Sequence, residues 1–257
     1  LRDAGGRGGH RLRHGGEVPV MRVTFLAHSG FAVELEQVCL LFDWWKGELP
    51  PLSADKPLLV FASHRHEDHF NPAVFSLDDG SRPVRFLLGH DIRLTERNLA
   101  RWRVSAETAE KCLSLGGNDC TQPLPGIAVE TLPSTDEGVA FVVTAEGRTI
   151  YHAGDLHWWH WEGEDKAWNR NMEVNFKRYL APLEGRTLDL AMVPLDPRLE
   201  GAADWGLTYF LEHTDPRRVL PMHQWGDFAL TGRFLARHPQ WADRVVPITA
   251  EGQQFTF

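Results

Sequence analysis

One six-residue segment constrains this chain more than any other. Directly after an apolar run at residues 58–62 stand three imidazoles and two carboxylates, in the order His64-Arg65-His66-Glu67-Asp68-His69. Neutral imidazole nitrogens and carboxylate oxygens are ligands that divalent zinc, manganese and iron accept. A solvated polar loop would account for a single His-x-His pair, but three histidines held this close would repel one another when protonated. The segment therefore predicts a metal site at the C-terminal end of a strand.

Three other polar residues end strand-like apolar runs in the same way. Asp43 and His223 each come directly after such a run, and Asp155 comes after another with Ala153 and Gly154 between. Ends of strands from distant parts of a chain can meet at one edge of a scaffold, where loops carry functional groups. We therefore expect these residues to join the histidine segment in space.

The order of the predicted elements indicates the fold class. Strands are expected at residues 22–27, 31–35, 38–42, 58–62, 84–88, 127–132, 139–144, 148–152, 188–195, 219–222, 245–249 and 253–257, helices at 71–77, 91–113, 165–183, 205–213 and 227–238, and a loop at 116–125. Strand meanders followed by strands with helices between them, twice over, favour two packed β-sheets with helices outside. No repeat or long linker interrupts residues 21–257, which we predict to form one domain.

The first 20 residues differ from the rest in composition. They contain six glycines and four arginines, and they offer too little apolar surface to offset the entropy of ordering, so we expect a disordered N-terminal extension. Their net charge is +2, which leaves −10 for the remainder of a chain whose total is −8. This acidic balance disfavours nonspecific attraction to nucleic acid or to an anionic membrane.

The cysteine count and the hydropathy pattern restrict the compartment. No apolar run approaches the ~20 residues that a membrane span needs. The three cysteines Cys39, Cys112 and Cys120 have no Cys-x-x-Cys spacing, and their odd, sparse count argues against a disulfide framework. We therefore expect a cytoplasmic protein without a membrane partner. Because the acidic charge disfavours nucleic acid, we expect the substrate to be a small molecule.

These marks together resemble the metallo-β-lactamase fold superfamily, from about Met21 to the C-terminus. The resemblance rests on the histidine segment, on Ala153-Gly154-Asp155 and on the strand-end residues Asp43 and His223. It implies the α/β (α+β) class, as a four-layer αββα sandwich with one or two divalent metals at its edge. Within the superfamily, the chain is most similar to the compact bacterial branch of ascorbate-phosphate-lactonase-like hydrolases.

The resemblance also implies a role for each matching residue. His64 and His66 would bind a first metal. Asp68, His69 and His223 would bind a second metal, and Asp155 would bridge the two. Asp43 would hold the histidine segment at residues 64–69, called the motif loop below, without binding metal itself.

One ligand of the family pattern is missing. The family places a further histidine in the loop before the Gly-Asp motif, but residues 132–138 contain none. Asp136 could replace it, since carboxylates also bind zinc and manganese, and His157 is a second candidate. The plain alternative is that Asp136 only belongs to a polar turn. Because the sequence does not give the direction of this turn, we slightly favour an enzyme with one metal.

The ligand types predict a hydrolase. A divalent metal lowers the pKa of water to roughly 7 and polarises a carbonyl or phosphoryl oxygen, and Asp68 is expected to orient that water or to shuttle its proton. The expected substrate is a small lactone, ester or phosphoester, and zinc is the first choice of metal, with manganese and iron as alternatives. The competing interpretations are a nuclease or phosphodiesterase of the same superfamily and a non-catalytic protein that binds a metal or ligand.

Ten tryptophans are present, and their positions indicate where a substrate binds. Most buried indoles belong to a core, but the polar run at residues 157–161 contains three that cannot all face inward. Amphipathic rings are suited to the walls of ligand pockets. We expect four tryptophans that closely follow candidate site residues to line the pocket: Trp45, Trp158, Trp159 and Trp225.

Overall fold

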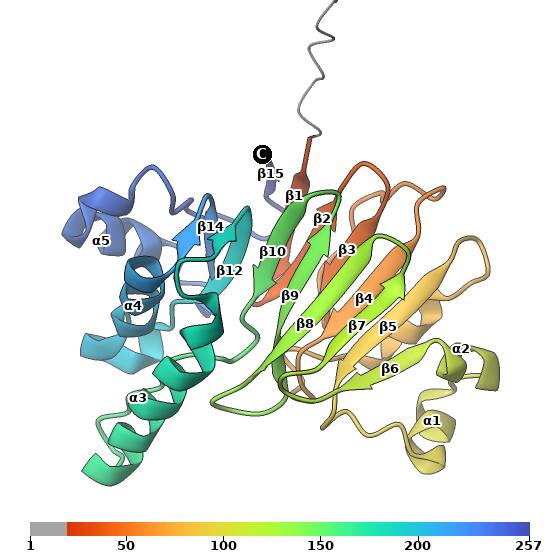
Figure 1. Cartoon of the computed structure of the whole chain (residues 1–257), viewed down its shortest axis with the longest axis horizontal. Coiled ribbons are helices and arrows are strands. Elements are labelled where there is room, and N and C mark those ends of the chain that lie inside the picture. The colour runs from red at the N-terminus through yellow and green to blue at the C-terminus, as the bar shows by residue number, and fades with distance from the viewer. Residues whose placement is uncertain (1–19) are drawn as a thin grey trace, which may run out of the picture.

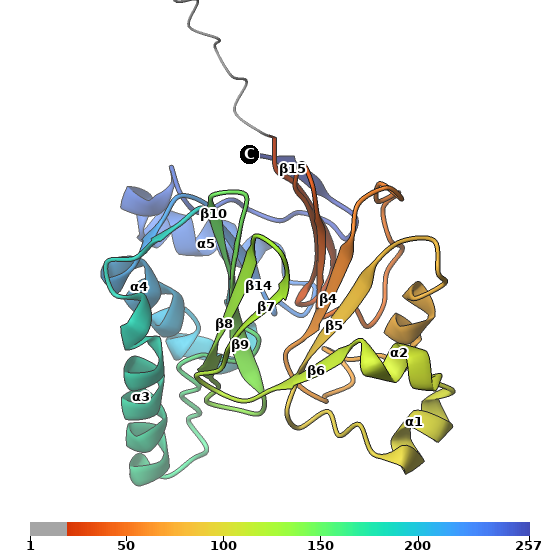
Figure 2. The same ribbon diagram turned by 45° about the vertical axis from the view of Figure 1, so that its right-hand side comes forward.

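The computed structural model describes residues 20–257. Two β-sheets pack face to face, and helices cover the outer face of each, so that four layers are visible in Figure 2. The αββα sandwich predicted from the sequence is confirmed. The predicted disordered extension, residues 1–20, lies outside the described residues except for Val20.

The first sheet has seven strands in the order β15-β1-β2-β3-β4-β5-β6. Their bounds are β1 Arg22–Ala27, β2 Gly30–Glu34, β3 Cys39–Phe42, β4 Leu58–Ala62, β5 Val84–Gly89, β6 Cys112–Leu115 and β15 Gln254–Thr256. Strands β1, β2 and β3 form an antiparallel meander, whereas β3 to β6 are parallel. All five residues of β4 are buried, as expected for a strand covered on both faces.

The second sheet has six strands in the order β14-β12-β10-β9-β8-β7. Their bounds are β7 Cys120–Leu124, β8 Ile127–Pro133, β9 Val139–Ala145, β10 Arg148–His152, β12 Leu190–Pro194 and β14 Val219–Met222, and the short strands β11 Thr187–Leu188 and β13 Asp215–Pro216 pair separately. Strands β9 and β10 form an antiparallel hairpin. Its two turn residues, Glu146 and Gly147, both have positive φ (53° and 73°), which suits a two-residue hairpin turn.

Helices on the two outer faces complete the layers (Figure 1). The first sheet is covered by the 3₁₀ helix η1 and by α1 and α2, and the second by α3, α4 and α5. Their bounds are η1 Pro72–Leu77, α1 Glu96–Trp102, α2 Ala106–Glu110, α3 Lys166–Leu180, α4 Trp205–His213 and α5 Ala229–Arg237; further 3₁₀ turns are η2 Ala181–Leu183, η3 Pro197–Ala202 and η4 Pro239–Trp241. Among residues 20–257, no helix combines the length and apolar character that a membrane crossing requires.

Strand direction places the C-terminal ends of many strands at one edge of the sandwich. In the first sheet β1, β3 and β4 run the same way, because β2 is antiparallel to both of its neighbours. In the second sheet β8, β10, β12 and β14 likewise run together. The backbone N–H of His223, after β14, donates to the carbonyl of His28, after β1, at 3.1 Å. The two sets of strand ends therefore meet.

The prediction of one long helix at residues 91–113 was wrong. Two short helices occupy part of this segment, and β6 takes the rest. Thr95 and Ser105 each begin a helix with a side-chain N-cap, and Arg103 ends α1 in the left-handed region (φ 59°). A second N-cap so soon after the first interrupts one helical run into two.

Two further predictions near the sheet edges were wrong. The loop expected at residues 116–125 contains strand β7, in which Pro123 is tolerated because β7 is an edge strand and needs no N–H on its open side. The strand expected at residues 245–249 is reduced to a single bridge between Val219 and Val245. Pro247 lacks the N–H that would continue such a ladder.

Candidate metal centre

Eight potential ligands meet at the edge where the strand ends converge. They form two groups, and within each group one ligand atom per residue lies within 4.8 Å of the others. The first cluster is His64, His66, Asp136 and Asp155, and the second cluster is His28, Asp68, His69 and His223. The structure therefore brings together all the predicted ligands except the alternative candidate His157, and it adds His28.

Asp155 faces both clusters. Its Oδ1 lies 3.2 Å from His69 Nε2 and 3.4 Å from His223 Nε2, whereas its Oδ2 lies 3.6 Å from His64 Nε2. Burial raises the pKa of this carboxyl group above its ordinary value, although His69 and His223 oppose the change. A carboxylate with one oxygen toward each cluster has the arrangement of a bridging ligand.

Asp43 anchors the start of the motif loop through hydrogen bonds. Its Oδ1 accepts the backbone N–H of Ser63 at 2.7 Å, and its Oδ2 accepts the Ser63 hydroxyl at 2.6 Å and lies 2.7 Å from His69 Nδ1. Burial alone would raise the pKa of Asp43, but the charges of His152 and His69 hold it at about 2. The ionised carboxylate therefore fixes the ring of His69 so that Nε2 points into the second cluster.

Asp196 does the same for His223. It follows β12, is fully buried, and its Oδ2 lies 2.9 Å from His223 Nδ1. The same oxygen accepts from Trp225 Nε1 at 3.3 Å, and Arg198 forms an ion pair with it at 2.6 Å. Arg198 also lies over the Trp225 ring, 4.5 Å from its centroid. One carboxylate thus orients both a candidate ligand and a nearby indole.

The unpartnered atoms of the site test whether a metal fits it. His64, His69 and His223 have Nδ1 within 2.9 Å of an oxygen, so that Nε2 is the free nitrogen on each ring. These three Nε2 atoms and Asp155 Oδ1 are buried with no hydrogen-bond partner. Buried polar atoms are rarely left in this state, and a metal-bound histidine typically has its other ring nitrogen hydrogen-bonded to an oxygen. The residues therefore fit divalent metals.

Strained backbone is concentrated at this edge. His28, Asp43, His223 and Trp225 have positive φ angles of 57°, 43°, 63° and 53°. Such a conformation costs of order 1–3 kcal/mol at a residue other than glycine, and it persists where the surroundings impose it. The fold thus accepts local strain in order to aim these side chains.

Two glycines allow the motif loop to pack closely against the second sheet. A Cβ on Gly138 would lie 1.9 Å from the carbonyl oxygen of Ser63, and a Cβ on Gly154 would lie 2.7 Å from Ser63 Cβ. Both glycines have positive φ, 69° and 51°. This approach brings Asp136 and Asp155 next to His64.

Asp136, and not His157, lies where the sequence analysis found a ligand missing. Asp136 Oδ2 is 3.5 Å from His66 Nδ1, and both side chains are 42% exposed, so the first cluster opens to solvent. His157 is fully buried outside both clusters, where its ring packs against Gly206 and Trp159. Burial lowers the pKa of His157 to about 4, so its ring is neutral.

A substitution distinguishes these two residues. Asp136→Asn is expected to lower metal affinity at the first cluster by roughly tenfold or more, because asparagine keeps the shape but loses the charge that attracts a divalent cation. His157→Gln should leave metal affinity unchanged. Metal titration of both variants and the parent, followed by elemental analysis, measures the effect. Equal affinity in the parent and Asp136→Asn would remove Asp136 from the ligand set.

Of the four tryptophans predicted to line the pocket, three lie near the second cluster and one does not. Trp45 and Trp225 line a cavity of about 240 Å³ together with His28 and Asp68. Trp159 is buried, with its ring centroid 5.5 Å from that of His223. The expectation that Trp158 lines the pocket needs correction.

Trp158 points to the other side of the chain. Its ring packs on Phe176 of α3 and Trp205 of α4, under the ammonium group of Lys177. Consecutive residues in an extended segment point to opposite sides, so only one of Trp158 and Trp159 can face the clusters.

Sequence reasoning missed His28 and Asp196. His28 directly follows β1, and Asp196 comes two residues after the end of β12, so a similar pattern was present in the sequence. His28 stands in a two-residue turn between β1 and β2, a position that the sequence alone assigns to a strand meander and not to a site. Its contact with Asp68, 3.2 Å between Nε2 and Oδ2, requires the pairing of distant segments.

Comparison with known proteins identifies the family. Residues 22–170 match the family model described as the beta-lactamase superfamily domain. This chain belongs to that superfamily. It has the metallo-β-lactamase fold, and it is a metal-dependent hydrolase, in agreement with the description that its relatives carry.

Several relatives are described as UPF0173 metal-dependent hydrolases. A UPF0173 metal-dependent hydrolase of Opitutus terrae is 35% identical over 150 residues, which are 52% of this chain and 63% of that protein. Another, from Nitratidesulfovibrio vulgaris, is 29% identical over 237 residues, which are 84% of this chain and 88% of that protein. The narrower resemblance of this superfamily member to ascorbate-phosphate lactonases stays a prediction.

Solved structures support the fold at lower identity. Igni18, a metallo hydrolase from Ignicoccus hospitalis, superposes with a TM-score of 0.59 at 18% identity, over 93% of this chain and 98% of the other. An isothiocyanate hydrolase from Delia radicum gut bacteria superposes with a TM-score of 0.56 at 13% identity, over 92% and 99%. At such identities the likeness concerns the architecture of the superfamily alone.

Proposed function

We propose that this hydrolase cleaves a small lactone, ester or phosphoester with two divalent metals, zinc being the first choice. The position of Asp155 carries the proposal, because its two oxygens face two complete ligand clusters. This replaces the single metal favoured on the sequence alone, where the direction of the Asp136 turn was unknown. Divalent metals bound there would supply Lewis acidity, lowering the pKa of water to roughly 7 and stabilising negative charge on a substrate oxygen.

The size and lining of the cavity beside the second cluster favour a compact substrate. Its volume is about 240 Å³, at the low end for small-molecule sites, and Phe25, Met222 and Phe228 add apolar surface to the two indoles of Trp45 and Trp225. Lys46 lies over the Trp45 ring at 4.8 Å from its centroid. An apolar group of the substrate would pack between the indoles, and its polar end would face His28 and Asp68.

Asp68 has the contacts that proton transfer requires. Its side chain is 28% exposed, it lines the cavity, and its Oδ2 lies 3.2 Å from His28 Nε2. Burial would raise the pKa of Asp68, but the hydrogen bond with His28 and the charge of His69 hold it below its ordinary value. The carboxylate is therefore ionised, and it can orient the attacking water and pass a proton to the leaving group.

Turnover by metal-loaded protein tests the proposal. The panel contains a five-membered lactone, a p-nitrophenyl ester, a p-nitrophenyl phosphate and bis(p-nitrophenyl) phosphate, together with single-stranded RNA. We expect hydrolysis of at least one of the first three, loss of activity with a chelator, and recovery when zinc is returned. Cleavage of RNA alone would favour the nuclease alternative. No turnover above that of free metal, with both clusters loaded, would contradict a catalytic role.

A substitution tests the role of Asp68. Asp68→Asn should lower kcat per bound metal by roughly a hundredfold, because an amide keeps an oxygen for the metal but cannot accept the proton. Asp55→Asn, at an exposed position, is the control and should match the parent. Metal content is measured alongside rate, so that loss of metal and loss of the proton acceptor are separated. An unchanged kcat per metal would exclude Asp68 as the base.

A further inference from the structure

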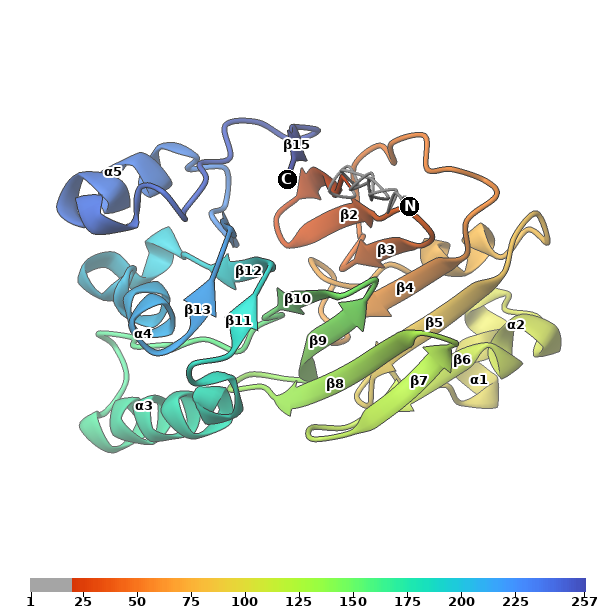
Figure 3. The same cartoon turned by 45° about the horizontal axis from the view of Figure 1, so that its top comes forward.

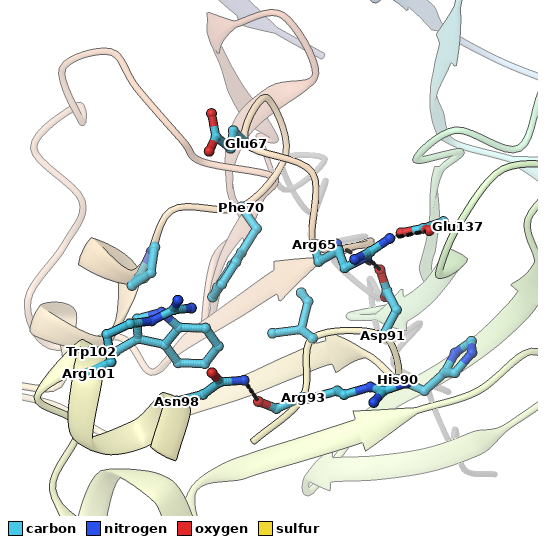
Figure 4. A pocket seen from close by; sticks show the side chains of 12 residues that line it. Arg65, Glu67, Phe70, His90, Asp91, Arg93, Asn98, Arg101, Trp102 and Glu137 are labelled. Carbon is cyan, nitrogen blue, oxygen red and sulfur yellow. Dashed lines mark hydrogen bonds and ion pairs between the residues drawn. The ribbon is translucent and has the colours of Figure 1, made fainter. Parts of the chain in front are cut away.

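A second and larger cavity, about 880 Å³, lies beside the motif loop (Figure 4). Arg65, Glu67 and Phe70 line one wall, whereas the loop residues between them belong to the two clusters. The opposite wall comes from the segment that leads into α1 and from α1 itself, including Arg93, Asn98, Arg101 and Trp102. None of the eight candidate metal ligands lines this cavity.

The arginines of the cavity are in two different states. Arg65 is neutralised, because its Nε and Nη2 donate to the two carboxylate oxygens of Glu137 at 2.5 Å and Asp91 lies 3.9 Å from Nε. Arg93 and Arg101 form no ion pair with a carboxylate of residues 20–257. Both are exposed residues of the lining, and unpaired positive charge at the wall of a cavity attracts anions.

The remaining acidic residue of the lining does not neutralise them. Glu67 stands at the upper end of the view in Figure 4, whereas Arg93 and Arg101 lie in its lower half, and Glu67 forms no ion pair with either arginine in the described residues. The lining therefore holds three arginines and three carboxylates, and Arg93 and Arg101 are its two cations that pair with no carboxylate of residues 20–257.

An aromatic wall stands between the two free arginines. The Trp102 ring packs edge-on against Phe70, with centroids 5.4 Å apart, and the guanidinium carbon of Arg101 lies 5.6 Å from the Trp102 centroid. Asn98 is held by a hydrogen bond from its Nδ2 to the carbonyl of Arg93 at 2.7 Å, which leaves its amide oxygen toward the cavity. Figure 4 shows Arg93 and Arg101 on either side of this aromatic surface.

We propose that this cavity binds an anionic small molecule with a planar or apolar body. The body packs on Trp102 and Phe70, and a carboxylate or phosphate group is bound by Arg101 or Arg93. Planar guanidinium groups match the oxygen spacing of both acids, and an indole face provides apolar contact at low entropic cost. The binding site is separate from the cavity at the second cluster and does not depend on which bond the enzyme hydrolyses.

The Arg65–Glu137 ion pair connects the proposed site to the first cluster. Arg65 lies between His64 and His66 in the chain, and Glu137 Oε2 lies 3.6 Å from His66 Nε2. The proposed site and the first cluster therefore share this wall.

Equilibrium binding to the metal-loaded chain tests the proposal. The probes are phenylacetate and benzylphosphonate, which resist hydrolysis, and neutral phenylacetamide. We expect both acids, or one of them, to bind with a Kd of about 1 mM or tighter, and the amide to bind at least roughly tenfold more weakly. The relative affinity of the two acids distinguishes a carboxylate ligand from a phosphate ligand. Quenching of tryptophan fluorescence and calorimetry provide independent readouts.

Variants distinguish this cavity from the metal centre, which also attracts anions. The double variant Arg93→Gln/Arg101→Gln should weaken acid binding by roughly tenfold or more while its melting temperature and metal content stay at the parent values. Arg97→Gln is the matched control, since Arg97 is an exposed arginine of α1 outside the lining. Undiminished binding in the double variant, or no binding of either acid to the parent, would overturn the proposal.

Discussion

Asp155→Asn is expected to abolish hydrolysis and to release metal from both clusters. Asparagine fits the same space, but it removes the negative charge that lies between His64 on one side and His69 and His223 on the other. We expect kcat/KM to fall by roughly a thousandfold or more, the upper range for loss of one preorganised electrostatic group. Metal content should fall from about two equivalents to less than one, because both clusters lose a shared anionic ligand.

An exposed aspartate, Asp243, provides the control for the Asp155 substitution. Asp243→Asn changes the net charge equally at an exposed position and should leave rate and metal content at the parent level. Steady-state kinetics and elemental analysis on the same preparations give both numbers. Should Asp155→Asn retain two metals, the bridging role assigned to this carboxylate would be wrong, even if its activity were lower.

Asp43→Ala is expected to have the largest effect on stability. It removes the acceptor for the Ser63 N–H, the Ser63 hydroxyl and His69 Nδ1 from a fully buried position. Removal of one partner from a buried charged network costs about 3–5 kcal/mol. For a chain of this size, that corresponds to a fall in melting temperature of roughly 10 °C, measured on metal-loaded protein.

Asp43→Asn separates the hydrogen bonds from the charge. Asparagine keeps one acceptor oxygen, so we expect about half of the loss in melting temperature and a smaller loss of metal affinity, within the 10–100-fold range typical of residues that orient a ligand. If Asp43→Ala melted within a degree or two of the parent, the motif loop would be held by something other than this carboxylate.

The histidine segment of the site could be predicted because its ligands are close together in the sequence. The histidine segment follows a buried strand, and the residues that need a metal stand within six positions of one another. Asp155 and His223 were also found, since a polar residue after an apolar run is visible without knowing the partner. The layers of the sandwich followed from the order of strands and helices.

The remaining parts depend on pairings that separate segments make in space. Whether Asp136 turns toward His66 depends on Gly138 packing against Ser63, a contact between residues far apart in the chain. His28 becomes a candidate ligand only because β1 and β4 end at the same edge. Strand β7 was missed for a related reason, because Pro123 is compatible with a strand only at the edge of a sheet.

The positions of the ligands along the chain have a consequence for biosynthesis. His64, His66, Asp136 and Asp155 all precede His223, which comes after β14, so a nascent chain possesses the whole first cluster while the second is still incomplete. The second cluster is therefore complete only when β14 pairs with β12, so that metal binding there is linked to completion of the second sheet.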